Sequence, residues 1–189
     1  MSGAVGEPGT KEIISLAELE ASAGVRTGRK HILSILVENK PGVLTRIAGL
    51  FARRGFNINT LAVGPTDDPR LSRITLTLDG AMHPIDQVTK QLHKLVNVLK
   101  IRDLEPSETV ARELAMFKVA VDGASRGEAM QIVEIFRGKI IDVTKRSLII
   151  EITGTWEKIE AFERMLRPFG MVEMARTGEI AISRGRGET

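Results

Sequence analysis

The residues that bracket one predicted helix are the part of this sequence best suited to bind a small molecule. The helix covers residues 43–54; Asn39 and Gly42 precede it and Asn57 follows it. First-turn N–H groups have no intrahelical acceptor and carry partial positive charge, which suits a carboxylate. The asparagine carbonyls can accept protons from an ammonium group, and Leu44 and Ile58 can line a small apolar pocket. The candidate site for a free amino acid comprises Asn39, Gly42, Val43, Leu44, Asn57 and Ile58.

The same residues also have an interpretation in which no ligand binds. In that interpretation the side chain of Asn39 caps the helix, and Asn57 supports the turn that follows it. Spacing alone leaves both interpretations open.

Residues that could carry catalysis are scarce elsewhere in the chain. His31, His83 and His93 lack the spacing of metal ligands. No serine lies in a nucleophile-elbow pattern, and no glycine-rich phosphate loop precedes a helix. Asp67 and Asp68 are adjacent, but the sequence DDP between two strands is typical of a turn. We therefore expect no catalytic residue, metal or cofactor on this chain.

Composition predicts an ordinary globular protein of one domain or two small ones. The chain has 189 residues, of which 42% are hydrophobic and 27% charged, and its net charge is +3. The mild charge, the single tryptophan and the lack of tyrosine argue against nucleic-acid binding. No stretch has the apolar length of a membrane span, no signal peptide is recognisable, and there is no cysteine. We expect a cytoplasmic protein that binds neither nucleic acid nor a membrane.

The pattern around the candidate site predicts a small sheet that positions it. The expected elements are a strand at 31–37, a helix at 43–54, strands at 56–63 and 72–78, a helix opened by Pro84 and a strand at 98–104. The loop 64–70 makes the second and third strands a hairpin, and the third alternates apolar Ile74 and Leu76 with polar Thr75 and Thr77. This strand–helix–strand order, repeated once, is the ferredoxin-like (βαββαβ) layout.

After a linker at 104–109 the same order of elements returns. The expected elements are a strand at 114–121, a helix at 126–137 ended by Gly138, strands at 139–144 and 148–153, a helix at 156–166, and a strand pair or one interrupted strand at 171–175 and 179–183. Residues 1–29 are expected to be a disordered N-terminal extension. The prediction is an α+β protein with two ferredoxin-like domains, at 30–105 and 110–185. The sheet faces and edges not covered by helices need a partner.

Several motifs in order also resemble one protein family. They are NKPGVLTRIAGLFARRGFNI, GPTDDPRLSRITLTLDG, KQLHKLVNVLKI, FRGKIIDV and ARTGEIAISRG. Together they resemble the regulatory (small) subunits of acetolactate synthase, also called acetohydroxyacid synthase, and the first is similar to the ACT amino-acid-binding domain. The resemblance covers about residues 30–185, so the first domain is expected to be an ACT domain.

The resemblance implies a function in branched-chain amino acid biosynthesis. A chain of this family is a non-catalytic homodimer that activates a separate catalytic large subunit, on which thiamine diphosphate, Mg²⁺ and FAD are expected. It confers feedback inhibition by a branched-chain amino acid, usually valine. In the family, the positions that match Asn39, Gly42 and Asn57 belong to the effector site at the dimer interface.

The sequence leaves two other classes of function as alternatives to a regulatory subunit. The first is a stand-alone ACT-type amino-acid sensor or a ferredoxin-like nucleic-acid-binding module. Modest charge and few aromatic residues argue against nucleic acid, and no helix-turn-helix accompanies the domains. The second is an enzyme in its own right, which the lack of recognisable catalytic groups makes the weakest alternative.

Overall fold

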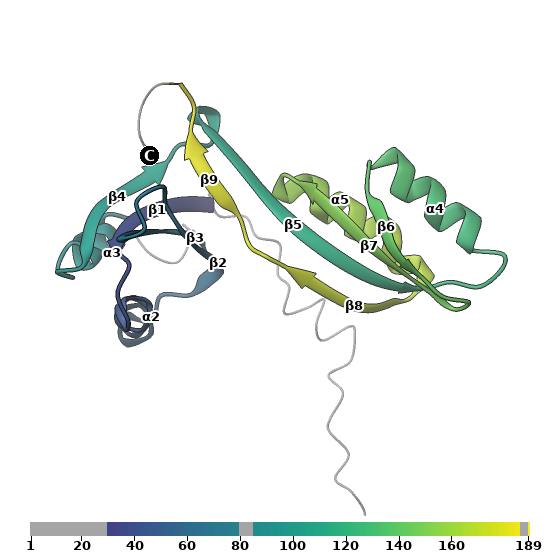
Figure 1. The fold of residues 1–189 in the computed structure, drawn as a ribbon, viewed down its shortest axis with the longest axis horizontal. Helices are drawn as coiled ribbons and strands as arrows, with labels where there is room; N and C mark the ends of the chain where they lie inside the picture. Colours follow the sequence, from purple (N-terminus) through teal and green to yellow (C-terminus); the bar gives the residue numbers. More distant parts are fainter. Residues whose placement is uncertain (1–29, 80–84, 186–188) are drawn as a thin grey trace, which may run out of the picture.

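The first half of the chain forms a four-stranded antiparallel sheet with two helices (Figure 1). The computed structural model describes residues 30–79, 85–185 and 189, so the expected N-terminal extension and Pro84 lie outside the described residues. The elements are β1 (Lys30–Glu38), α2 (Val43–Arg54), β2 (Ile58–Pro65), β3 (Leu71–Asp79), α3 (Ile85–Leu92) and β4 (Val98–Leu104). The strand order β2-β3-β1-β4 is that of the ferredoxin-like fold, as predicted.

Helix α2 has the predicted bounds because its limits are encoded locally. Val43, Ile47 and Phe51 recur at helical spacing and are buried against the sheet. Gly42 and Gly55 take the left-handed conformation on either side of the helix, with φ of 82° and 69°. The predicted hairpin of β2 and β3 is also confirmed, although β2 begins at Ile58 rather than at residue 56.

The second half repeats the layout around one long strand. Its elements are the 3₁₀ turn η1 (Pro106–Glu108), β5 (Thr109–Ala120), α4 (Arg126–Ile135), β6 (Lys139–Val143), β7 (Ser147–Gly154), α5 (Trp156–Leu166), the 3₁₀ turn η2 (Arg167–Phe169), β8 (Met171–Arg176) and β9 (Ile180–Ser183). The order is β6-β7-β5-β8, and β9 pairs with β5 as well. The fifth strand arises because the final segment, predicted as a strand pair or one interrupted strand, forms both β8 and β9.

Strand β5 starts five residues earlier than predicted. Residues 109–112 carry no buried-strand pattern of their own, but they pair with β9 in the register Thr109↔Ser183 to Arg112↔Ile180. Further along, β5 pairs with β8 from Ala115 to Val119. The final segment is thus one strand interrupted at 177–179, which resolves the alternative left open by the sequence.

Helix α4 ends differently from the prediction. The helical residues stop at Ile135, and Arg137 rather than Gly138 takes the left-handed conformation, with φ of 55°. A Cβ at Gly138 would lie 3.2 Å from Val133 Cγ1 and 3.4 Å from the carbonyl oxygen of Glu151. Glycine at position 138 allows this close packing, and the left-handed conformation lies at its neighbour Arg137.

Each sheet packs its helices over a separate apolar core. In the second core Phe162 is fully buried, and its ring centroid lies 5.4 Å from Phe117 and 5.3 Å from Phe136. Phe162 thus belongs to this core, whereas Trp156 at the start of α5 is only half-buried. A third small cluster places Ala181 of β9 against Ile32 and Leu104, on the face of the first sheet away from its helices. Strand β9 of the same chain therefore covers part of the sheet face that was expected to need a partner.

Candidate functional site

The N-terminus of α2 is open and uncompensated by acidic residues of its own. The helix has no acidic residue in its first turn, and Gly42 precedes it without any side-chain cap. The N–H of Val43 faces the Lys40 carbonyl at 3.4 Å, and the N–H of Arg46 donates to the Gly42 carbonyl at 3.0 Å. Between them, Leu44 contributes a first-turn N–H that has no intrahelical acceptor. A Cβ built on Gly42 would meet nothing within 4 Å, so the space directly beside this turn is open.

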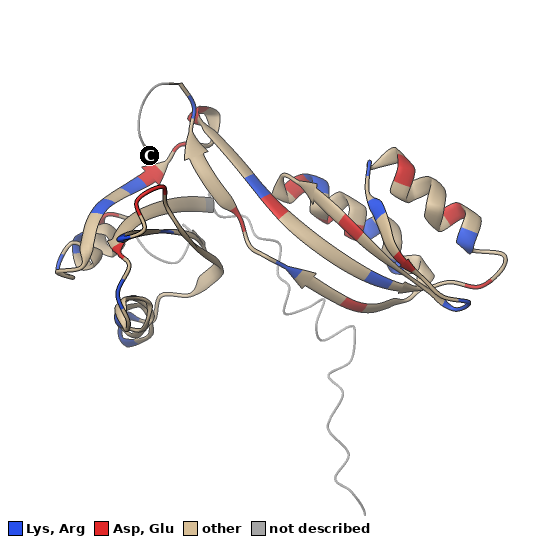
Figure 2. Cartoon of the chain, in the orientation of Figure 1, with Lys and Arg blue, Asp and Glu red and all other residues tan. Residues whose placement is uncertain are grey.

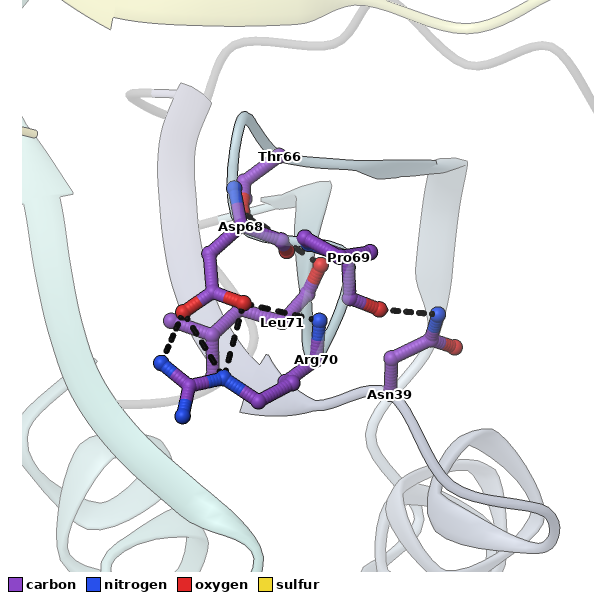
Figure 3. A network of polar contacts seen from close by, with 6 residues as sticks. All are labelled: Asn39, Thr66, Asp68, Pro69, Arg70 and Leu71. Carbon is purple, nitrogen blue, oxygen red and sulfur yellow. Dashed lines mark hydrogen bonds and ion pairs between the residues drawn. The ribbon is translucent and has the colours of Figure 1, made fainter.

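The side chain of Asn39 binds the β2–β3 loop and does not cap α2. Its side-chain Nδ2 donates to the carbonyl oxygen of Pro69 at 3.0 Å, and its backbone N–H donates to that of Arg70 at 2.7 Å. Asn39 therefore ties the segment before α2 to the β2–β3 loop, and the expectation that it caps the helix is wrong. Figure 3 shows its side-chain carbonyl oxygen pointing away from Pro69.

The β2–β3 loop that receives Asn39 is held by its own polar contacts (Figure 3). Arg70 Nη2 lies 2.7 Å from Asp68 Oδ2, and the Arg70 backbone N–H donates to Asp68 Oδ1 at 2.9 Å. Thr66 Oγ1 donates to the Asp68 carbonyl at 2.9 Å. The Arg70 side chain, followed by its backbone N–H, lowers the pKa of Asp68 to about 2. The interpretation of the DDP sequence as turn chemistry is supported by these contacts.

Of the remaining predicted site residues, Val43 and Leu44 lie in the first turn of α2, and Asn57 and Ile58 lie beyond its other end. Val43 is buried, so only its backbone can face a ligand, whereas Leu44 is 40% exposed. Asn57 is exposed and Ile58 half-buried, at the start of β2. Asn57 Nδ2 lies 3.5 Å from Asn59 Oδ1, a contact at the limit of hydrogen bonding. The structure thus places Ile58 at the start of the edge strand β2 with Asn57 just before it, and Asn39, Gly42 and Leu44 around the start of the helix.

Sequence reasoning missed a polar cluster beside the start of α2. The Glu38 carboxylate accepts hydrogen bonds from Asn97 Nδ2 and from Lys40 Nζ, the second at 3.0 Å. These contacts, that of Asn97 first, lower the pKa of Glu38. Asn97 also accepts a hydrogen bond of 3.0 Å from Arg46 Nη1. The signal available in the sequence was Arg46 itself, one helical turn beyond Gly42, but its partner Asn97 is 51 residues away.

Charge on the described surface is mixed. Figure 2 shows Lys and Arg interspersed with Asp and Glu along the helices and the strands. His31 Nδ1 pairs with Asp103 Oδ2 at 2.9 Å across β1 and β4. Among residues 30–79, 85–185 and 189, no group of His, Asp and Glu side chains could hold a metal ion. Within the same residues, no helix is long and apolar enough to cross a bilayer.

Comparison with known proteins gives consistent matches over both halves of the chain. Residues 33–100 match the family model described as the acetohydroxyacid synthase (AHAS) small subunit-like ACT domain. Residues 112–185 match the family model of the small subunit of acetolactate synthase. The acetolactate synthase small subunit of Mycolicibacterium smegmatis is 50% identical over 155 residues, which cover 82% of this chain and 91% of that protein. The corresponding protein of Mycobacterium bovis is 48% identical over 157 residues, covering 83% and 94%.

A solved structure agrees with the sequence comparisons. The crystal structure of the acetolactate synthase small subunit from Thermotoga maritima superposes with a TM-score of 0.77 at 46% sequence identity, covering 84% of this chain and 99% of that one. The match includes both ferredoxin-like sheets and confirms the predicted α+β class. The chain therefore belongs to the family of acetolactate synthase small subunits, and its first domain is of the ACT type.

Proposed function

We propose that this chain is a non-catalytic regulatory subunit that binds and activates a separate acetolactate synthase large subunit. The partner would carry thiamine diphosphate, Mg²⁺ and FAD, and the complex would act in the cytoplasm in branched-chain amino acid biosynthesis. The proposal is supported by family membership over both domains. The single structural observation that carries the regulatory part is the open, uncapped start of α2 at Gly42.

We infer that the effector is a branched-chain amino acid, valine in the first instance. Its carboxylate would lie on the first-turn N–H groups near Gly42, Val43 and Leu44, where the helix dipole favours negative charge. The side-chain carbonyl of Asn39 would accept ammonium protons from one copy of the chain, and that of Asn57, which lies beyond the other end of α2, would do so from a second copy. Asn39 is well placed for this because its amide group is already committed to Pro69, which fixes the direction of its carbonyl oxygen.

A homodimer would complete this site. Asn57 and Ile58 stand at the start of β2, which is an edge strand of the first sheet. The strand INTLAVGP contains no charged residue, and its Val63 is 48% exposed. Edge strands that stay free in solution are generally protected by charge, bulges or proline. In β2 such features are limited to an irregular register between Ile58 and Thr60 and to Pro65 at its end, and the residues between them carry no charge. We therefore propose that a second copy packs along β2 and supplies the apolar side of the pocket formed with Leu44 and Ile58.

Inhibition would be a coupling between effector binding and the contacts that activate the large subunit. Such couplings are typically about 5- to 150-fold in affinity and are reciprocal. The large subunit must then change the affinity of this chain for valine. Equal valine affinity with and without the partner would argue against equilibrium coupling.

The effector site is tested by titration calorimetry of valine, leucine and isoleucine into the wild type, Gly42→Asp and Gly42→Asn. Aspartate and asparagine have nearly the same size, and both tolerate the positive φ of this position better than other side chains. Aspartate alone places a carboxylate where that of the ligand is proposed to lie, so repulsion should abolish binding. Gly42→Asn should bind more tightly than Gly42→Asp, and equal affinities in these two variants would contradict the placement of the carboxylate.

Activation is tested by acetolactate formation with the purified large subunit. We expect the large subunit alone to be less active than the mixture, and valine to inhibit only the mixture. Acetolactate formation by this chain alone with thiamine diphosphate would contradict the non-catalytic role.

A further inference from the structure

The segment between β8 and β9 is a point where the second domain touches strand β2. Figure 1 shows this segment, at the yellow end of the chain, running between the two domains. Gly178 is buried, and a Cβ built on it would lie 3.1 Å from Thr60 Cβ and 3.4 Å from the Leu61 backbone nitrogen. Gly178 also has φ of 76°, which L side chains rarely adopt. Both the close approach to Thr60 and the backbone conformation therefore favour glycine at this contact.

The segment is firmly attached to β5 of the second domain. The Thr177 backbone N–H donates to the Leu114 carbonyl at 3.0 Å, and the Leu114 N–H donates to Thr177 Oγ1 at 3.1 Å. Next to it, Arg176 forms an ion pair with Glu113, whose side chain is fully buried. Removal of one partner of such a pair leaves a buried charge, so the pair resists separation. Residues 176–178 must therefore move together with β5.

The contact at Gly178 is narrow, because cavities lie on both sides of it. One cavity of 300 Å³ lies between Asn59 and the helix α5 residues Trp156 and Glu160. The other, of 550 Å³, lies between β2 and β9 and is lined by Val63 and Ile180 among others. The packing of β2 against the second domain is therefore interrupted on both sides of Gly178, and the close approach of Gly178 to Thr60 is the tight point between the two cavities.

A second contact joins the same segment to the first sheet. Three residues beyond Gly178, Ala181 is buried against Ile32 of β1 and Leu104 of β4. The segment therefore packs on β1 and β4 of the first sheet through Ala181. It also contacts the edge strand β2 through Gly178. A displacement of β2 relative to β1 would change the direction of the segment and, through it, that of β5.

We propose that Gly178 transmits occupancy of the effector site to the second domain. The proposal rests on the function proposed above, because Asn57 and Ile58 stand at the start of the strand that Gly178 contacts. Thr60 is two residues beyond Ile58, and its Oγ1 lies 2.7 Å from Thr77 Oγ1, which joins β2 to β3 at the contact. A ligand that draws the start of β2 toward α2 would shift Thr60 and Leu61 against Gly178. Gly178 is a positioning residue, since it does not touch the proposed ligand.

The test compares Gly178→Ala with Gly185→Ala in the full chain. Gly185 has φ of 77°, nearly the same as that of Gly178, but a Cβ there would meet nothing within 4 Å. Both variants therefore carry the same backbone strain, and only Gly178→Ala adds a methyl group to the contact. Valine affinity is measured by calorimetry, and valine inhibition is measured in the complex with the large subunit. The distance between the domains is measured by spin labels at Lys94→Cys and Lys145→Cys, two exposed positions in a chain without cysteine.

Gly185→Ala should match the wild type in all three measurements. Gly178→Ala should still bind valine but lose most of its inhibition, by a factor within the roughly 5- to 150-fold range of allosteric couplings. Valine should also shift the interdomain distance in the wild type and not in Gly178→Ala. Inhibition of Gly178→Ala at the wild-type valine concentration would overturn the proposal while leaving the effector site intact. A wild type that binds no branched-chain amino acid would instead overturn the proposed function, and this coupling with it.

Thr177→Val provides a second variant in case Gly178→Ala fails to fold. Thr177 is exposed, and valine keeps its shape while removing the Oγ1 that accepts from the Leu114 N–H. The segment would be loosened from β5 without any new atom at β2. Weakened valine inhibition with unchanged valine binding supports the proposal, and unchanged inhibition overturns it.

Discussion

At the scale of single residues, the ion pair of Asp68 and Arg70 stabilises the β2–β3 loop whose Pro69 carbonyl accepts the hydrogen bond from Asn39. Arg70 lowers the pKa of Asp68 to about 2, from an ordinary value of 3.8. The unfolded chain therefore binds more protons in this range, and the stability that the pair contributes is complete above about pH 4. It is lost as the pH falls through about 2. Because the pair is open to solvent, the contribution is small.

We expect Asp68→Asn to be less stable than the wild type at pH 7. The difference in free energy of unfolding should shrink as the pH falls from about 4 toward 2, since protonation removes the same charge from the wild type. Urea unfolding at a series of pH values measures this difference. Arg70→Gln serves as the control, because without the guanidinium the pKa of Asp68 in the folded chain moves back toward its unfolded value and most of this pH dependence should disappear. A difference that is constant down to pH 2 would show that the pair does not contribute.

Asn39 shows what the sequence could and could not predict of the candidate site. Its position before a helix made it a candidate for binding or capping, because both roles depend on neighbouring residues. Its actual partner, the Pro69 carbonyl, is 30 residues away and becomes adjacent only when β3 pairs with β1. The partner of Arg46, Asn97, was out of reach for the same reason. The residue types of the site were predictable, but the contacts that orient them depend on the assembled sheet.

At the scale of the elements, the turn after α4 carries a strain that a simple exchange should reveal. Arg137 adopts φ of 55°, a conformation that costs an L residue about 1–2 kcal/mol. Arg137→Gly should therefore raise the free energy of unfolding by roughly 1 kcal/mol, less what the unfolded chain gains in entropy. Gly138→Ala should lower it by about 1–3 kcal/mol, because the methyl group meets Val133 and the Glu151 carbonyl.

Chemical denaturation of these two single variants measures both effects. The two changes lie at adjacent positions, so each controls for the general effect of mutating this turn. Stability changes of the same sign would mean that the left-handed residue and the close packing have been assigned to the wrong positions.

Elements with local signals were predicted better than elements made by distant pairing. The bounds of α2 and α5 follow from apolar stripes and from Gly55 and Pro168, all within or beside the helices. Residues 109–112, at the end of the predicted linker and just after it, were not predicted as a strand because only β9, some 70 residues later, pairs with them. The assignment of Gly138 as the helix end failed because its need for close packing involves β7. Local rules therefore described the helices and missed the long-range edge pairing.

At the scale of the whole molecule, two separate cores predict that the domains respond independently to core damage. Phe162→Ala should cost about 3–5 kcal/mol in the second core, and Ile47→Ala about 2–5 kcal/mol in the first, because both side chains are fully buried. Hydrogen–deuterium exchange should quicken in β5–β8 for Phe162→Ala and in β1–β4 for Ile47→Ala. Equal acceleration in both sheets for either variant would indicate that the domains open as one unit.

Strand β5 also determines when the second sheet of a newly synthesised chain can be completed, because it pairs with the last strand, β9. All strands of the first sheet lie before residue 105, so that sheet can close while the rest is still being synthesised. Residues 109–112 of β5 must wait for β9, which ends at Ser183. At ribosomal speeds of about 5–20 residues per second, this wait lasts on the order of ten seconds. During that time the start of β5 is an open strand edge, so the nascent chain is most prone to aggregate just before its last strand emerges.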